Sequence, residues 1–164
     1  MTHDRPIKLY VFDADGTLRR TTVEGQPCPN KPGEWELIPG VRERLSQIDW
    51  TCASFGVASN QGGVGTGYMR HEAAWQLLFD MAAAALGSEP PAGSIEMCPH
   101  APYSNCPCRK PKPLMLRRLM HRFRATKRET LFVGDMDRDK EAARRAGVRF
   151  LWAHEFFGWE TPGA

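Results

Sequence analysis

The first regular element of this chain is expected in Ile7-Lys8-Leu9-Tyr10-Val11-Phe12-Asp13-Ala14-Asp15-Gly16-Thr17. Residues 7–12 are β-prone, and they stop at Asp13, just before a Gly-Thr turn. This pattern predicts a buried strand that carries two carboxylates, those of Asp13 and Asp15, at its end. Similar short runs downstream predict four more strands, at residues 52–58, 95–97, 130–133 and 148–152.

Helical patterns separate these strands. Four segments are predicted to be helices. Apolar residues recur at helical spacing over residues 39–50 and share one face over residues 114–123, whereas residues 68–86 are rich in Ala and Leu and end at a glycine, and residues 137–146 also end at a glycine. Strands that alternate with helices predict an α/β fold of three layers, in which a mostly parallel five-stranded sheet is covered on both faces. Residues 18–38 are polar and rich in Pro and Gly, so they predict a loop with room for a small hairpin.

The length of 164 residues predicts one domain, spanning residues 1–164, with a core of its own. No apolar run approaches the roughly 20 residues that cross a bilayer, and the first five residues lack the plan of a signal peptide. We therefore expect a cytoplasmic monomer without membrane contact. Only 43 residues separate Asp15 from Ser59, and part of them forms a helix, which leaves no room for a large cap domain.

Polar side chains follow three of the predicted strands, and the carboxyl ends of parallel strands are where ligands bind. Grouped carboxylates suit Mg²⁺. A carboxylate can also attack phosphorus, and Asp15 lies near enough to Asp13 to give a proton to the leaving oxygen. The Asp-Ala-Asp-Gly-Thr sequence alone is equally typical of an Asp-rich turn. The polar residues are Asp13 and Asp15 after the first strand, Ser59 and Asn60 after the second, and Asp135, Asp137 and Asp139 after the fourth.

Three of the five cysteines lie within eleven residues, together with a histidine, at Cys98, His100, Cys106 and Cys108. Three thiolates and an imidazole fit a closed tetrahedral site for structural Zn²⁺, in a small loop over residues 98–108. A buried-thiol loop or a disulfide is the alternative, although cytosolic reduction disfavours a disulfide. Cys52 lies apart, in an apolar run, and is predicted to be a buried core residue.

The net charge of +3 conceals a basic block between Arg109 and Arg128, which holds nine Lys or Arg and no Asp or Glu. Such a block can follow a nucleic-acid backbone, or it can be the solvated face of a helix whose other face is core. Four aromatic residues have two similar interpretations, base stacking or packing. They are Trp35, Phe156, Phe157 and Trp159.

The ordered motifs D-x-D-G-T, S-N-Q, R-K-P and G-D-x-x-x-D resemble those of the haloacid dehalogenase (HAD) superfamily of phosphohydrolases, and the resemblance runs from Tyr10 to about Trp159. It implies a Rossmann-like HAD fold and a Mg²⁺-dependent phosphatase that works through an aspartyl-phosphate. The resemblance also implies a role for each motif residue. It makes Asp13 the nucleophile, Asp15 the general acid/base, Ser59 the holder of the phosphoryl group, Lys110 the neutralising cation, and Asp13, Asp15 (through its backbone carbonyl) and Asp135 the Mg²⁺ ligands.

Three more residues are expected to bind substrate, namely Asn60, Arg109 and Lys112. Lys112 is also the rival of Lys110 for the catalytic role, and Asp139 or Asp137 is a candidate to complete the Mg²⁺ site. Phosphoryl transfer needs positioning and charge neutralisation, which a cation, a hydroxyl and loop amides supply.

The segment C-P-H-A-P-Y-S-N-C-P-C-R-K-P, residues 98–111, is similar to the zinc-loop branch of this superfamily, which includes histidinol-phosphate phosphatases and D-glycero-D-manno-heptose 1,7-bisphosphate phosphatases. There the zinc loop leads straight into the catalytic Arg-Lys pair, so the resemblance implies that zinc positions the site without taking part in the chemistry. It also implies a small sugar phosphate or a histidinol-phosphate-like substrate. Three departures leave the sugar open: Ala14, Met136 and the short interval from Cys98 to Cys106.

Two other functions stay open. Residues 25–40 and 154–159 resemble the phosphatase half of polynucleotide kinase/phosphatases, which share D-x-D-G-T and remove DNA 3′-phosphates. This alternative makes a nucleic-acid end the substrate of the uncapped site. The remote alternative is a non-catalytic, zinc-stapled binding module, which requires the loss of a key catalytic group, yet the chain retains all of them.

Overall fold

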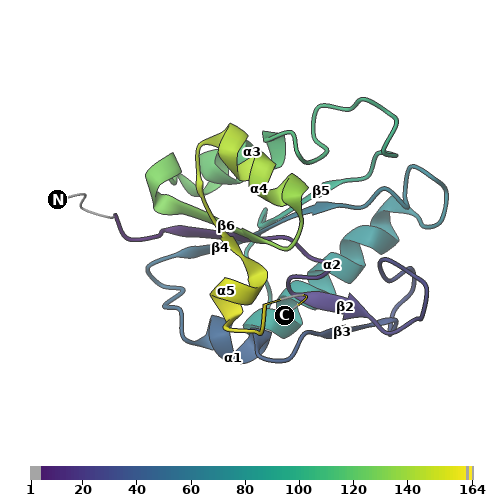
Figure 1. Ribbon diagram of the computed structural model, residues 1–164, viewed down its shortest axis with the longest axis horizontal. Coiled ribbons are helices and arrows are strands. Elements are labelled where there is room, and N and C mark those ends of the chain that lie inside the picture. Colours follow the sequence, from purple (N-terminus) through teal and green to yellow (C-terminus); the bar gives the residue numbers. More distant parts are fainter. Residues whose placement is uncertain (1–4, 162, 164) are drawn as a thin grey trace.

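A five-stranded parallel sheet runs through the middle of the computed structural model, which describes residues 5–161 and 163 (Figure 1). The strands lie in the order β5-β4-β1-β6-β7, and each neighbouring pair is parallel. In the central strand, Phe12 pairs with Val57 of β4 and with Val133 of β6. The predicted sheet is therefore confirmed. Its strands are β1 (Leu9–Phe12), β4 (Ser54–Asn60), β5 (Ile95–Cys98), β6 (Thr130–Gly134) and β7 (Arg149–Trp152).

Helices cover both faces of the sheet, which confirms the predicted three layers (Figure 1). Side chains alternate along β1, so that Leu9 and Val11 pack with α3 and α4, whereas Phe12 packs with α1, α2 and α5. No helix within residues 5–161 is both long and apolar enough to cross a membrane. The helices are α1 (Val41–Ser46), α2 (His71–Leu86), α3 (Leu114–Phe123), α4 (Asp137–Ala146) and α5 (Ala153–Phe157).

A small antiparallel hairpin, made of β2 (Arg19–Thr21) and β3 (Trp35–Leu37), follows the first strand. Within the described part of the chain, only this hairpin and α1 lie between β1 and β4. No cap domain is inserted there, as the short interval predicts.

The short helix α5 is an element that the sequence patterns do not predict. Its Phe156 is buried, with the ring centroid 5.5 Å from that of Phe12. Beyond the helix, Trp159 stacks on Phe157 with centroids 4.7 Å apart, and its Nε1 donates to the carbonyl oxygen of Pro39 at 2.9 Å. Of the two interpretations of the aromatic tail, the structure shows packing.

The basic residues of α3 lie opposite its apolar face, which is buried against the sheet through Met115, Leu116, Leu119 and Met120. Arg122 pairs with Glu96 of β5 at 3.0 Å, and Arg118 approaches the same carboxylate at 3.7 Å. Part of the positive charge of the basic block is therefore compensated within the fold.

The predicted burial of Cys52 is wrong. The residue is exposed, and its Sγ donates to the Asp49 carboxylate at 3.3 Å. The β-prone run enters the sheet only at Ser54, so Cys52 lies in the turn before it.

A capped turn before β6 makes a pH-dependent contribution to stability. The carboxylate of Glu129 accepts the backbone N–H and Oγ1 of Thr126, both at 3.0 Å, and pairs with Lys8 Nζ at 3.0 Å. These contacts, led by the Thr126 N–H, lower the pKa of Glu129 from 4.5 to about 2. Because the folded-state pKa is the lower one, the contribution is complete at neutral pH and is lost as the pH falls from about 4.5 towards 2.

We expect Glu129→Gln to lower the midpoint of thermal unfolding at pH 7, because the variant loses the ionised cap. The difference in thermal midpoint between the variant and the unsubstituted protein should be smaller at pH 3 than at pH 7, as followed by circular dichroism. Glu24→Gln, at an exposed loop position, is the control. A difference that stays the same at both pH values contradicts the assignment.

Candidate active site

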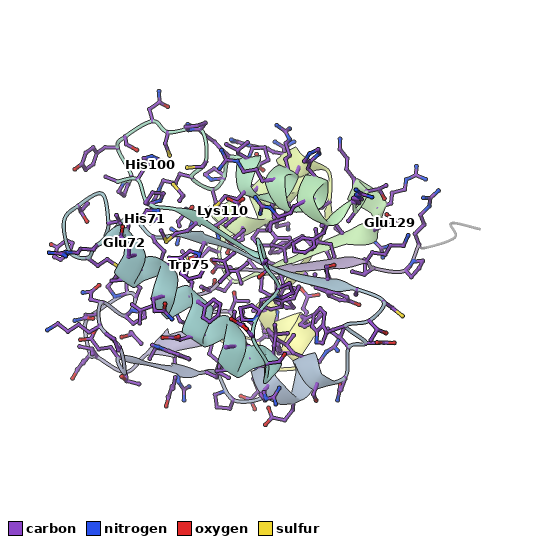
Figure 2. The ribbon with its side chains drawn as sticks, turned by 180° about the vertical axis from the view of Figure 1, so that it is seen from behind. His71, Glu72, Trp75, His100, Lys110 and Glu129 are labelled. Carbon is purple, nitrogen blue, oxygen red and sulfur yellow. The ribbon has the colours of Figure 1, made fainter. Side chains whose placement is uncertain are left out.

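Residues from four segments meet at the carboxyl edge of the sheet, as the parallel topology requires. Asp13 follows β1, Ser59 lies near the end of β4, and Asp135 follows β6. Lys110 reaches the same place from the loop before α3. Figure 2 shows it inside the molecule, with His100 on the loop beyond it.

Lys110 is the buried cation of this site. Its Nζ donates to Asp13 Oδ1 at 2.7 Å and to the carbonyl oxygen of Ala58 at 2.8 Å, and it pairs with Asp139 Oδ1 at 2.7 Å. Burial favours the neutral amine, but the carboxylates of Asp13 and Asp139 raise the pKa of Lys110 above its ordinary value. The side chain is therefore an ammonium held against Asp13.

Three carboxylates form a cluster that can hold a cation. Oxygen atoms of Asp13, Asp135 and Asp139 lie within 4.8 Å of one another. Burial raises the pKa of Asp13 well above its ordinary value; Lys110 opposes this rise, and the carboxylates of Asp139 and Asp135 add to it. Burial raises the pKa of Asp135 as well. Because three close carboxylates outweigh one ammonium, an oxygen-preferring divalent cation such as Mg²⁺ fits this cluster.

Asp139 supports the cluster from the first turn of α4. Its Oδ2 accepts the backbone N–H groups of Asp135 and Met136 at 3.2 and 3.1 Å, while Oδ1 faces Lys110. Both oxygens thus hold neighbouring groups in place. Asp137, the other candidate, is exposed and lies outside the cluster.

The turn after β1 needs a glycine at position 16, both for its backbone conformation and for the close approach of Asp135. The φ of Gly16 is +86°, and a Cβ at this position would lie 2.1 Å from Asp135 Oδ2. The next residue, Thr17, donates its hydroxyl to Asp135 Oδ1 at 3.3 Å. The turn therefore brings the acidic ends of β1 and β6 together.

The side chain of Asp15 faces Arg19 and Gln61. Its Oδ1 accepts Arg19 Nε at 2.8 Å, and its Oδ2 accepts Gln61 Nε2 at 3.0 Å. Gln61 Nε2 also lies 2.8 Å from Ser59 Oγ. The Asp15 side chain contributes nothing to the carboxylate cluster. Sequence reasoning assigns no role to Arg19 or Gln61: the S-N-Q motif contains Gln61, whereas no motif marks Arg19.

The three predicted substrate-binding residues occupy different places. Asn60 holds the backbone of Lys110, because its Oδ1 accepts the Lys110 N–H at 3.0 Å and its Nδ2 donates to the Lys110 carbonyl at 3.2 Å. Arg109 lines the cleft beside Asp15, and Asn60 lines it as well. The Lys112 ammonium donates instead to the carbonyl oxygen of Cys106. The structure therefore places Lys110 beside the nucleophile candidate, whereas the Lys112 ammonium contacts the loop that carries the Cys and His residues, 98–108.

A cleft of about 620 Å³ opens beside Asp15. Residues of the 25–30 loop and of the 62–68 segment line it, and two guanidinium groups, those of Arg109 and Arg138, add positive charge. Its volume lies in the range of small-molecule sites.

The Cys/His cluster has the dimensions of a zinc site. The Sγ of Cys98 lies 3.5 Å from Cys106 Sγ and 3.5 Å from His100 Nδ1, and His100 Nδ1 lies 3.2 Å from Cys108 Sγ. A tetrahedral Zn²⁺ with Zn–S distances of about 2.3 Å separates its ligands by roughly 3.5–3.8 Å. The three cysteines are free thiols, so these four donors fit zinc and leave no open coordination position.

The chain matches known proteins over most of its length. A family model described as HAD-hydrolase-like matches residues 107–154. The chain is 34% identical over 148 residues to the D-glycero-beta-D-manno-heptose-1,7-bisphosphate 7-phosphatase of Pseudomonas putida. The matched region covers 87% of this chain and 80% of that protein. The chain is 32% identical to the histidine biosynthesis bifunctional protein HisB of Legionella pneumophila, over 93% of this chain and 43% of that protein.

A solved structure shows the same fold. The D,D-heptose 1,7-bisphosphate phosphatase of B. bronchiseptica, complexed with magnesium and phosphate, superposes with a TM-score of 0.75 at 28% identity, covering 88% of this chain and 79% of that one. The chain is thus a phosphatase that belongs to the haloacid dehalogenase superfamily, in the branch of the heptose 1,7-bisphosphate 7-phosphatases.

Proposed function

We propose that this phosphatase hydrolyses the phosphate ester of a small sugar through a phosphorylated Asp13. The observation that carries the proposal is the 2.7 Å contact between Lys110 Nζ and Asp13 Oδ1, beside two further carboxylates. A buried ammonium fixes the attacking carboxylate and can neutralise the oxygens of the transferring phosphoryl group.

The proposed reaction has two halves. In the first, an oxygen of Asp13 attacks phosphorus, the bond from phosphorus to the sugar oxygen breaks, and Asp15 gives that oxygen a proton. In the second, the carboxylate of Asp15 takes a proton from a water molecule that attacks the same phosphorus, and the bond to Asp13 breaks to release inorganic phosphate. The Ser59 hydroxyl and the Lys110 ammonium hold the phosphoryl oxygens in both halves.

The two metals have separate roles in this proposal. Asp13, Asp135 and the backbone carbonyl of Asp15 would hold Mg²⁺, which supplies positive charge for the phosphoryl group when bound. The Cys/His loop would hold Zn²⁺ as a structural ion. Because Cys108 directly precedes Arg109 and Lys110, zinc would fix the start of the catalytic segment.

The substrate class rests on the cleft and on the relatives. A volume of about 620 Å³ suits a sugar phosphate, and Arg109 and Arg138 suit an anionic one. The relatives from Pseudomonas putida and Pseudomonas aeruginosa carry the name of a heptose 1,7-bisphosphate 7-phosphatase. Met136 and Ala14 differ from the residues usual in that branch, so the proposal extends to the class of sugar phosphates and not to one sugar.

A substrate panel tests the proposal. It compares release of inorganic phosphate from heptose bisphosphate, other sugar phosphates, histidinol phosphate, nucleotides and a 3′-phosphorylated oligonucleotide, with Mg²⁺ and with a chelator. We expect the highest kcat/KM for a sugar phosphate and no turnover without Mg²⁺. Preference for the oligonucleotide, with a KM that rises steeply with salt, would instead establish the polynucleotide alternative.

We further propose that residues 1–164 work as one catalytic domain, as a monomer and in the cytoplasm. Every side chain of the candidate site comes from one chain, and all five cysteines are free thiols, as is usual in a reducing compartment. Light scattering of the purified protein tests the monomer.

A further inference from the structure

Arg19 is the largest of the fully buried side chains in the described part of the molecule, with no exposed surface. Its guanidinium contacts Asp15 through two nitrogen atoms, Nε to Oδ1 at 2.8 Å and Nη2 to Oδ2 at 3.3 Å. A two-point contact of this kind fixes the plane of the carboxyl group as well as its distance.

The backbone places Arg19 under the turn that carries the acidic residues. Its N–H donates to the carbonyl oxygen of Ala14 at 3.1 Å, and its own carbonyl accepts the N–H of Gly16 at 2.8 Å. It is also the first residue of β2, where it pairs with Leu37 of β3. The hairpin therefore positions the Arg19 guanidinium against the carboxyl group of Asp15.

Packing alone does not account for this arginine. Its Nη1 is buried and has no hydrogen-bond partner among the described residues. A buried donor without a partner is unfavourable, and replacing a buried ion pair by apolar residues is often neutral or stabilising. A role in the chemistry of Asp15 accounts for its presence at this position.

Gln61 holds Asp15 from the other side. Its Nε2 donates to Asp15 Oδ2 at 3.0 Å, so that three donor atoms engage the carboxyl group: one at Oδ1 and two at Oδ2. A carboxyl group has about four lone-pair sites, and the remaining one lies on Oδ1. About a fifth of the Asp15 side chain is exposed, and the residue lines the cleft.

We propose that Arg19 is a positioning residue, which together with Gln61 holds Asp15 so that Oδ1 carries the proton to the leaving oxygen. This inference rests on the proposed function. As the bond between phosphorus and the substrate oxygen breaks, the proton moves from Asp15 Oδ1 to that oxygen, and Asp15 is left as a carboxylate paired with Arg19. The arrangement favours esters of alcohols such as sugars, whose oxygen leaves poorly without a proton.

The test compares two leaving groups. A sugar alkoxide needs the proton, whereas p-nitrophenolate departs without one. Arg19→Met should lower kcat by about a hundredfold for the sugar phosphate that ranks first in the panel, and by less than about fivefold for p-nitrophenyl phosphate, with KM changed little. Arg19→Lys should recover part of the loss, because it restores the charge without the two-point contact. Arg20→Gln is the matched control, since Arg20 is exposed and pairs with Glu36 across the hairpin.

Equal losses with both substrates would overturn the inference and leave Arg19 with a purely structural role. Gln61→Met serves if Arg19→Met does not fold, because it removes a donor to Asp15 without removing a charge from the core. Because Gln61 also contacts Ser59, this variant should lower kcat for both substrates, but more for the sugar phosphate than for p-nitrophenyl phosphate. Equal losses with both substrates would again overturn the inference. If the unsubstituted protein hydrolyses neither substrate, the proposed function itself fails.

Discussion

Asp13→Asn should lower kcat by at least about a thousandfold, because an amide oxygen cannot form the covalent intermediate. The loss should be selective for activity. Asparagine has nearly the same shape as aspartate and still offers an oxygen to Lys110 Nζ, 2.7 Å away. It also removes one of three crowded carboxylates: burial of Asp13, and after it the nearby carboxylates of Asp139 and Asp135, raise the pKa of Asp13. The thermal midpoint should therefore stay the same or rise.

The measurement is phosphate release from the best panel substrate, alongside thermal unfolding and zinc content. Asp80→Asn is the matched control, because Asp80 is exposed on α2 and accepts a hydrogen bond from the neighbouring Gln76. Activity of the Asp13 variant within tenfold of the unsubstituted protein would contradict nucleophilic attack by this residue.

Cys106→Ser should lower the zinc content from about one ion per chain to nearly none, because a tetrahedral site loses one of its four ligands. The thermal midpoint should fall by more than about 10 °C, since structural zinc contributes several kcal/mol to folding. Turnover should fall with it. The loop that carries the ligands continues into Lys110, whose backbone exchanges two hydrogen bonds with the Asn60 side chain.

Cys52→Ser is the control for this experiment, because Cys52 is exposed and far from the cluster in sequence. Elemental analysis, thermal unfolding and kcat should all match the unsubstituted protein. A Cys106 variant that binds no zinc yet keeps its midpoint and its turnover would refute the structural role of the metal.

The sequence patterns predict the framework of this molecule well. The predicted bounds of α3 and α4 coincide with the observed ones, because α3 has a clear apolar face and α4 ends at a glycine. The parallel sheet follows from the alternation of strands and helices. The meeting of Asp13 with Asp135 then follows from the sheet, since both residues stand directly after neighbouring strands.

Contacts between side chains of loops are not predictable in this way. Lys110 and Lys112 are equivalent as a spacing pattern, and only the three-dimensional path of the Cys/His loop turns one towards Asp13 and the other towards Cys106. Arg19 is a charged residue in a polar segment, which predicts a position at the surface, yet its side chain is fully buried. Helix α5 is not predicted from the sequence, because a helix of five residues is too short to show a repeat of apolar residues at helical spacing.

The hydrogen bonds between Asn60 and Lys110 join residues 50 positions apart, and Lys110 meets Asp13 across 97 positions. Strand β6, which brings Asp135, lies next to β1 in the sheet although it comes late in the chain. A chain is synthesised from its N-terminus, so Asp13 is made well before Lys110 and Asp135. Until those two residues have been made, Asp13 lacks the partners that the proposed reaction needs. We therefore expect a chain that stops before β6 to show no phosphatase activity.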